Sequence, residues 1–142
     1  MKKVSIIFGS TTGNTEEAAG IIKSHLTDAE ISVIDVCKVK NEDVTGADLV
    51  ILGASTWGWG EIQDDFIPFY EDMSSELFDG KEFAVFGCGD KDGYEDTFCE
   101  AVTLISEKAK ECGGVEKVEP LKIDGDVSDS ADQIKQFATS LN

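Results

Sequence analysis

The stretch VSIIFGSTTGNT, residues 4–15, decides the fold class of this chain. It begins with a short apolar run, Val4, Ile6, Ile7 and Phe8, of the kind found in a strand buried on both faces of a parallel sheet. Gly9 ends the run, and a polar loop then leads directly into a helical pattern. Five loop side chains can hydrogen-bond an anion: Ser10, Thr11, Thr12, Asn14 and Thr15. A strand, a polar loop and a helix N-terminus in this order predict a phosphate-binding turn.

The loop contains no lysine or arginine, which limits its chemistry. A Walker-type loop ends in Gly-Lys-Ser/Thr, whereas this loop ends in Gly13-Asn14-Thr15, so nucleotide hydrolysis is not expected. Gly9 and Gly13 do not give the G-x-G-x-x-G of a dinucleotide site, although Asp35 falls near the position of a ribose-binding acid. A phosphatase would need a cysteine nucleophile and an arginine. The loop is therefore predicted to hold a phosphate without reacting with it; the alternative is a helix cap rich in serine and threonine.

Length and charge limit the classes of partner. The 142 residues predict one domain, residues 1–142, with no internal repeat and no apolar run long enough for a membrane span. Twelve basic and 29 acidic residues give a net charge of −17. Nucleic acid and anionic membranes are repelled by so negative a protein, whereas its electrostatic field attracts basic proteins and steers their approach. The alternative is that the charge only keeps the protein soluble.

The cysteines and the histidine do not form a metal-binding pattern. Cys37, Cys88, Cys99 and Cys112 include no C-x-x-C pair, and the single histidine, His25, is distant from them in sequence. Zinc sites and thioredoxin-type chemistry are therefore not expected, and free thiols fit a reducing cytoplasm.

Apolar strand patterns alternate with helical ones along the chain. Strands are expected at residues 4–8, 31–36, 49–54 and 83–87, with a fifth within residues 115–123 that is interrupted by Pro120. Helices are expected at residues 16–26, 64–73, 97–112 and 131–141. This alternation predicts an α/β fold with a doubly wound, five-stranded parallel sheet and helices on both faces.

In such sheets ligands bind at the carboxyl ends of the strands, where the strand order reverses. Three segments follow predicted strands at that edge: residues 10–15, 55–62 and 88–99. The second holds Trp57 and Trp59 between glycines, and the third holds Tyr94 among acids. Aromatic rings on glycine-rich loops are available to stack on a flat ligand. With the phosphate loop, they predict a planar ring joined to a monophosphate.

These residues resemble the short-chain flavodoxin family over essentially the whole chain. Residues 10–15 resemble its FMN phosphate loop, and Ser55-Thr56-Trp57-Gly58 followed by QDDFIPFYEDM resembles its second flavin loop. Phe86-Gly87-Cys88-Gly89-Asp90 with Tyr94-Glu95 and Phe98-Cys99 resembles its third.

The resemblance implies a low-potential one-electron carrier that binds one FMN noncovalently and passes through semiquinone and hydroquinone states. It places Trp57 and Tyr94 on opposite faces of the isoalloxazine and turns the Gly58 carbonyl toward flavin N5. The cofactor-binding residues it implies are Ser10, Thr11, Thr12, Gly13, Asn14, Thr15, Ser55, Thr56, Trp57, Gly58, Cys88, Gly89, Asp90, Tyr94, Phe98 and Cys99. Such a carrier is expected to be a cytoplasmic monomer that is not an enzyme and that docks on redox partner proteins through their basic surfaces.

Two other functions fit the same fold. A flavin-dependent NAD(P)H:quinone reductase would need a second substrate pocket beside the flavin, for which 142 residues leave little material. A regulatory receiver would need a phosphorylatable aspartate after the third strand, where this chain has Ser55.

Overall fold

The computed structural model describes residues 2–9, 14–27, 29–57, 61–62, 66–89, 100–124 and 130–141. The strands are β1 (Lys2–Gly9), β2 (Ala29–Asp35), β3 (Leu49–Trp57), β4 (Glu61–Ile62), β5 (Glu82–Gly89), β6 (Val115–Glu116) and β7 (Leu121–Asp124). The helices are α1 (Asn14–His25), the 3-10 helix η1 (Val36–Lys38), α2 (Asn41–Thr45), α3 (Ile67–Asp72), α4 (Ser75–Phe78), α5 (Glu100–Glu111) and α6 (Ala131–Thr139).

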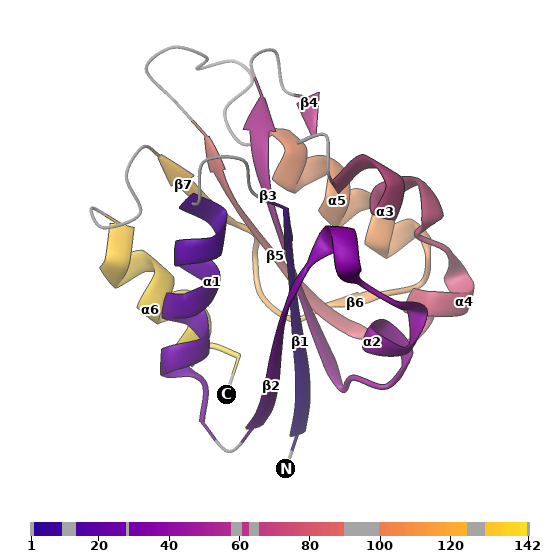
Figure 1. Ribbon diagram of the computed structural model, residues 1–142, viewed down its shortest axis with the longest axis horizontal. Helices are drawn as coiled ribbons and strands as arrows, with labels where there is room; N and C mark the ends of the chain where they lie inside the picture. The colour runs from indigo at the N-terminus through magenta and orange to yellow at the C-terminus, as the bar shows by residue number, and fades with distance from the viewer. Residues whose placement is uncertain are drawn as a thin grey trace.

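One sheet in the order β2-β1-β3-β5-β6 forms the centre of the molecule, and helices cover both of its faces (Figure 1). Its strands pair in parallel, and β7 joins β5 beside β6. The strand order reverses between β1 and β3, as in a doubly wound fold. The predicted fold class is confirmed, with β6 and β7 together taking the place of the fifth strand.

The sheet has an apolar core on each face. Successive residues of β3 alternate between them: Leu49 and Ile51 pack with α1 and α6, whereas Val50 and Leu52 pack with α5 and the segment around α3 and α4. Because a strand directs neighbouring side chains to opposite faces, a strand buried on both sides needs apolar residues at every position. This explains the continuous apolar run of β3.

The long helices begin and end close to their predicted bounds. In α3, Pro68 lies in the first turn, as predicted, where its missing N–H costs no helical bond. Gly113 ends α5 with φ of +90°, and the N–H of Gly114 donates to the carbonyl of Ala109 at 2.9 Å. The predicted starts of these two helices, residues 64–65 and 97–99, lie outside the described residues.

The fifth strand is interrupted as predicted. Glu116 of β6 pairs with Phe83, and Leu121 of β7 pairs with Phe86. Between these two pairs the chain advances by five residues from β6 to β7, whereas β5 advances by three. Two residues of the stretch 117–120 therefore have no counterpart on β5, which produces a bulge that contains Pro120.

Candidate functional site

The parallel register gathers the carboxyl ends of four strands at one edge of the sheet. Gly9 lies opposite Ala54, Ser55 opposite Cys88, and Gly89 opposite Asp124. Figure 1 shows β3, β5 and β7 ending together at the top of the molecule. This is the edge at which a doubly wound sheet binds its ligand.

A helix N-terminus also faces this edge. The helix α1 begins at Asn14, five residues after the end of β1, so the N–H groups of its first turn, which have no acceptor within the helix, lie at the carboxyl end of the sheet. Thr15 in its first turn is completely buried although it is polar. Glu16 and Glu17 of the same turn are exposed, so their carboxylates face solvent. The predicted anion-binding position is therefore built on a buried threonine at the start of a 12-residue helix.

Two glycines allow close packing beneath the edge. A Cβ at Gly53 of β3 would overlap the ring of Phe86, and a Cβ at Gly87 of β5 would overlap both the Ala54 carbonyl and the Val102 side chain of α5. The strands and α5 can approach each other here because neither position carries a side chain.

The structure brings together those predicted site residues that it describes. Asn14 and Thr15 start α1, Ser55, Thr56 and Trp57 end β3, and Cys88 and Gly89 end β5. All of them lie at the carboxyl edge of the sheet. The remaining predicted residues lie outside the described part of the chain: Ser10, Thr11, Thr12, Gly13, Gly58, Asp90, Tyr94, Phe98 and Cys99. Their roles stay predictions.

The second loop contains a strand that the sequence analysis missed. The two residues of β4 pair antiparallel with the end of β3, with Thr56 opposite Ile62 and Trp57 opposite Glu61. Residues 55–57 and 61–62, expected to belong to a loop, are therefore paired strand residues. The signal was present in the sequence, because Gly58 and Gly60 lie between residues typical of strands.

The described residues show no alternative site chemistry at this edge. None of their His, Cys, Asp and Glu side chains form a group of three that could hold a metal ion. Cys37 is exposed and Cys112 is buried, and neither forms a disulfide. Of the helices the structure describes, none combines the length and the apolar character needed to span a bilayer.

The family model described as flavodoxin matches residues 6–137. The chain belongs to the flavodoxin family. It is 46% identical over 131 residues to a flavodoxin of Maridesulfovibrio salexigens, a match that covers 89% of this chain and 88% of that one.

Solved structures of flavodoxins share the fold described above. Oxidised flavodoxin 2 from Bacillus cereus is 36% identical, with a TM-score of 0.88 over 97% of this chain and 96% of that one. The Fusobacterium nucleatum flavodoxin, solved with bound flavin mononucleotide, is 18% identical with a TM-score of 0.87, over 99% and 97% of the two chains. Flavodoxins are electron-transfer proteins that use FMN, so this chain is an electron carrier and not an enzyme. These relatives give no support to the quinone reductase alternative.

Proposed function

We propose that the whole chain forms one domain that holds FMN noncovalently at the carboxyl edge of its sheet and carries single electrons between redox proteins. The observation that supports this most directly is the strand register. It supports the proposal because the carboxyl ends of β1, β3 and β5, each of which precedes a predicted flavin loop in the sequence, lie at one edge. When bound, FMN accepts and returns electrons one at a time. The protein supplies the binding site and sets the potentials.

The donor set fits the phosphate of FMN. An anion at the start of α1 is favoured by the helix dipole and by backbone N–H groups that have no acceptor within the helix, without any lysine. The buried Thr15 is positioned to contribute in this first turn, and Ser10, Thr11, Thr12 and Asn14 supply the other hydrogen-bonding side chains. Such a set of hydrogen bonds holds a phosphate but has no group that would attack it.

The aromatic residues would contact the ring. Trp57 is the last residue of β3, at the edge itself, and Tyr94 belongs to the segment that follows β5. We assign one face of the ring to each. Gly58 follows Trp57, and a glycine there lets the peptide turn its carbonyl toward N5 with no Cβ penalty for positive φ.

Acidic residues in the second and third predicted flavin loops would lower the potential of the second electron. Seven carboxylates belong to residues 61–65 and 90–96. A carboxylate ~10 Å from a negative charge in a water-like medium disfavours that charge by about 0.4 kcal/mol before screening. Five or six such groups would contribute ~2 kcal/mol, or on the order of 90 mV for one electron. Amidation of these acids should therefore raise the second potential, and an unchanged potential would contradict this electrostatic account.

The same charge suggests the partners. A net charge of −17 would steer the carrier toward redox proteins with basic docking surfaces. We further propose that the protein is a monomer in the cytoplasm, where its cysteines would stay reduced.

A reductive titration of the purified protein tests the proposal. We expect a yellow protein with one FMN per chain whose visible spectrum changes in two separate one-electron steps. A protein that does not retain FMN would contradict the cofactor assignment. Steady NAD(P)H oxidation with a quinone and no partner protein would instead favour the enzyme.

A further inference from the structure

A second cluster of charged side chains lies at the opposite edge of the sheet, where the strands begin. Lys2 starts β1, Glu82 starts β5, and Lys117 directly follows β6. With Asp48, Gly80 and Lys81, they line a hollow of about 430 Å³. In a chain with 12 basic and 29 acidic residues, three lysines around one hollow are a local excess of positive charge.

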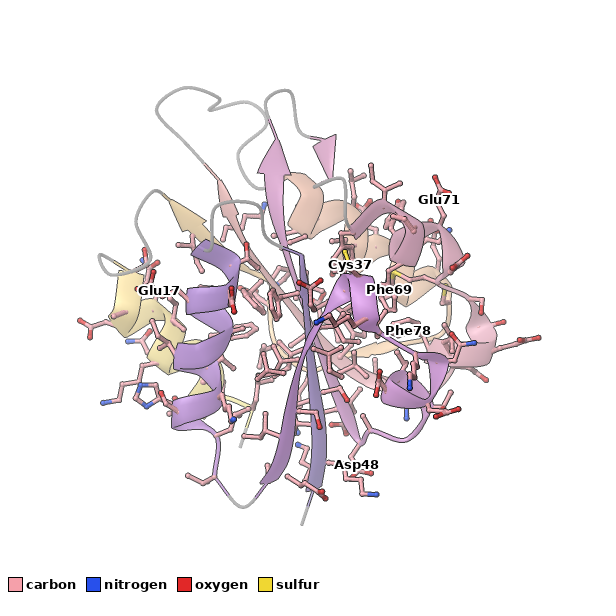
Figure 2. All side chains as sticks on the ribbon, viewed as in Figure 1. Glu17, Cys37, Asp48, Phe69, Glu71 and Phe78 are labelled. Atoms are coloured by element: carbon pink, nitrogen blue, oxygen red, sulfur yellow. The ribbon has the colours of Figure 1, made fainter. Side chains whose placement is uncertain are left out.

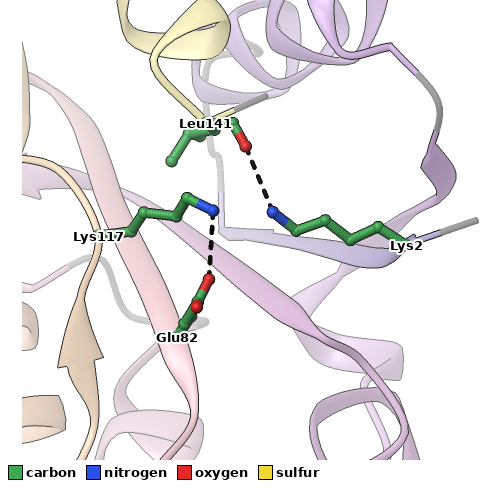
Figure 3. A network of polar contacts seen from close by, with 4 residues as sticks. All are labelled: Lys2, Glu82, Lys117 and Leu141. Atoms are coloured by element: carbon green, nitrogen blue, oxygen red, sulfur yellow. Dashed lines mark hydrogen bonds and ion pairs between the residues drawn. The ribbon is translucent and has the colours of Figure 1, made fainter.

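The two lysines at the centre of this cluster point toward one another. Figure 3 shows their ammonium groups facing each other between β1 and the segment after β6. Lys2 donates to the carbonyl of Leu141 at 3.3 Å, and Lys117 forms an ion pair with Glu82 at 3.2 Å. The nearby Lys117 lowers the pKa of Lys2, and partial burial lowers it further. Two cations held side by side are favoured when an anion lies between them.

Not all N–H donors of the three lysines are used by the protein. An ammonium group has three donors. Among the described contacts, Lys2 and Lys117 each use one donor, and Lys81 uses two, to the carbonyls of Thr45 at 3.2 Å and Ala47 at 2.5 Å. Beyond these contacts and the approach of Lys2 to Lys117, donors on the three residues remain for a ligand in the hollow.

The carboxylates of the hollow already have partners. Asp48 accepts from the backbone N–H of Lys3 at 2.9 Å, and Glu82 accepts from Lys117. Three ammonium groups against two carboxylates leave one positive charge in excess. The acidic residues elsewhere on the molecule oppose an anion only weakly here, because charges more than ~8 Å apart are largely screened at physiological ionic strength.

We infer that the hollow lined by Lys2, Lys81 and Lys117 is a second anion site, which binds a phosphate group independently of FMN. A tetrahedral phosphate offers several acceptor oxygens to donors that converge from different directions, and lysine is a common phosphate ligand. The source of the phosphate is either free inorganic phosphate or a small phosphate monoester.

The test is a phosphate titration of the FMN-loaded protein, in which the phosphate loop after β1 is already filled. The amide signals of Gly80, Lys81 and Glu82 are followed by NMR while chloride keeps the ionic strength constant. We expect saturable shifts confined to the residues around the hollow. Separate titrations with inorganic phosphate and glycerol 3-phosphate identify the source, since the tighter ligand is the one the hollow suits.

Matched charge variants distinguish a site from general screening. Lys117→Gln and Lys2→Gln each remove a charge-assisted contact and should weaken binding about tenfold or more. Lys38→Gln removes the same charge from η1, which follows the carboxyl end of β2 at the other edge, and should leave binding unchanged. Bound FMN and unchanged amides elsewhere show that each variant is folded. Shifts that grow without saturation, or that persist equally in all three variants, would overturn the inference.

Discussion

Gly20 and Gly80 both have open space around them, but their backbone conformations differ. At neither position would a Cβ have another atom within 4 Å, apart from the adjacent residues and, for Gly20, the backbone of its own helix. Gly20 lies exposed inside α1, where glycine costs up to ~1 kcal/mol relative to alanine, whereas Gly80 has φ of +73°, which alanine adopts only with strain. Open space alone therefore does not decide whether alanine is tolerated.

We predict that Gly20→Ala stabilises the FMN-loaded protein by roughly 0.5–1 kcal/mol, because it lowers the entropy of the unfolded chain and suits the helix. Gly80→Ala should destabilise it by ~1 kcal/mol or more because of its positive φ. Thermal unfolding measures both, with a change of roughly 2–4 °C per kcal/mol. Shifts of the same sign in the two variants would contradict this account.

Gly58 provides a second prediction at single-residue scale, which rests on its proposed role. If its peptide turns toward N5 when the first electron arrives, Gly58→Ala adds the cost of positive φ to the one-electron-reduced state only. That cost is about 1–2 kcal/mol, which lowers the first potential by roughly 40–90 mV. Spectroelectrochemistry measures the shift, and Gly60→Ala in the same hairpin serves as a control that should leave the potential unchanged. An unaltered first potential in Gly58→Ala would refute the role.

At the scale of elements, one polar contact connects α5 to the interrupted strand. The hydroxyl of Ser106, which is 3% exposed, donates to the carboxylate of Glu116 in β6. Lys110 of the same helix lies 3.5 Å from that carboxylate, but its side chain is 54% exposed against 18% for Glu116. The buried hydroxyl, not the exposed ammonium, is therefore the stronger partner.

We predict that Ser106→Ala lowers the free energy of unfolding by ~1.5–3 kcal/mol, as for a hydrogen bond to a charged group. Lys110→Gln, which removes an exposed ion pair, should cost less than ~1 kcal/mol. Urea unfolding of both variants measures which substitution lowers the free energy of unfolding more. A larger loss in the lysine variant would show that the ion pair fixes β6 against α5.

Long helices and strands in which apolar residues recur at a regular spacing could be predicted from the sequence, and short ones could not. The buried strands and α1, α5 and α6 repeat apolar residues over several turns or positions, so their existence follows from periodicity. In contrast, α2 and α4 bury one residue each, Val44 and Phe78, and carry no detectable period. Their helical form depends on tertiary contacts. Val44 and Phe78 belong to one core, and Lys81 donates to the carbonyls of Thr45, the last residue of α2, and of Ala47, two residues later.

The candidate site was predictable in its location because topology determines it. Once the strands are parallel and the order reverses, the segments after β1, β3 and β5 must share an edge, whatever their sequences. The hairpin of β3 and β4 was missed because two-residue strands have no periodicity, and only the glycines on either side of Trp59 indicated it. The second cluster, around Lys117, was not predictable either. It unites residues from the two ends of the chain and from its middle, and their meeting depends on register and packing.

At the scale of the whole molecule, the net charge of −17 governs encounters with partners. We predict that electron transfer to a basic redox protein slows as salt is raised, because the range of the field falls from about 30 Å at 0.01 M ionic strength to about 8 Å at 0.15 M. Stopped-flow mixing at several salt concentrations measures the rate. Transfer to a small neutral acceptor serves as the control and should vary little. A partner rate that does not depend on salt would contradict electrostatic steering.

The bulge between β6 and β7 has a consequence for self-association. These strands form one border of the sheet, where exposed backbone donors and acceptors could recruit a strand from another molecule and begin aggregation. Here the border is divided into strands of two and four residues, and Pro120 between them has no N–H to offer. A strand from another molecule could not form a continuous row of backbone hydrogen bonds along this border. The bulge therefore protects this side of the sheet from edge-to-edge association.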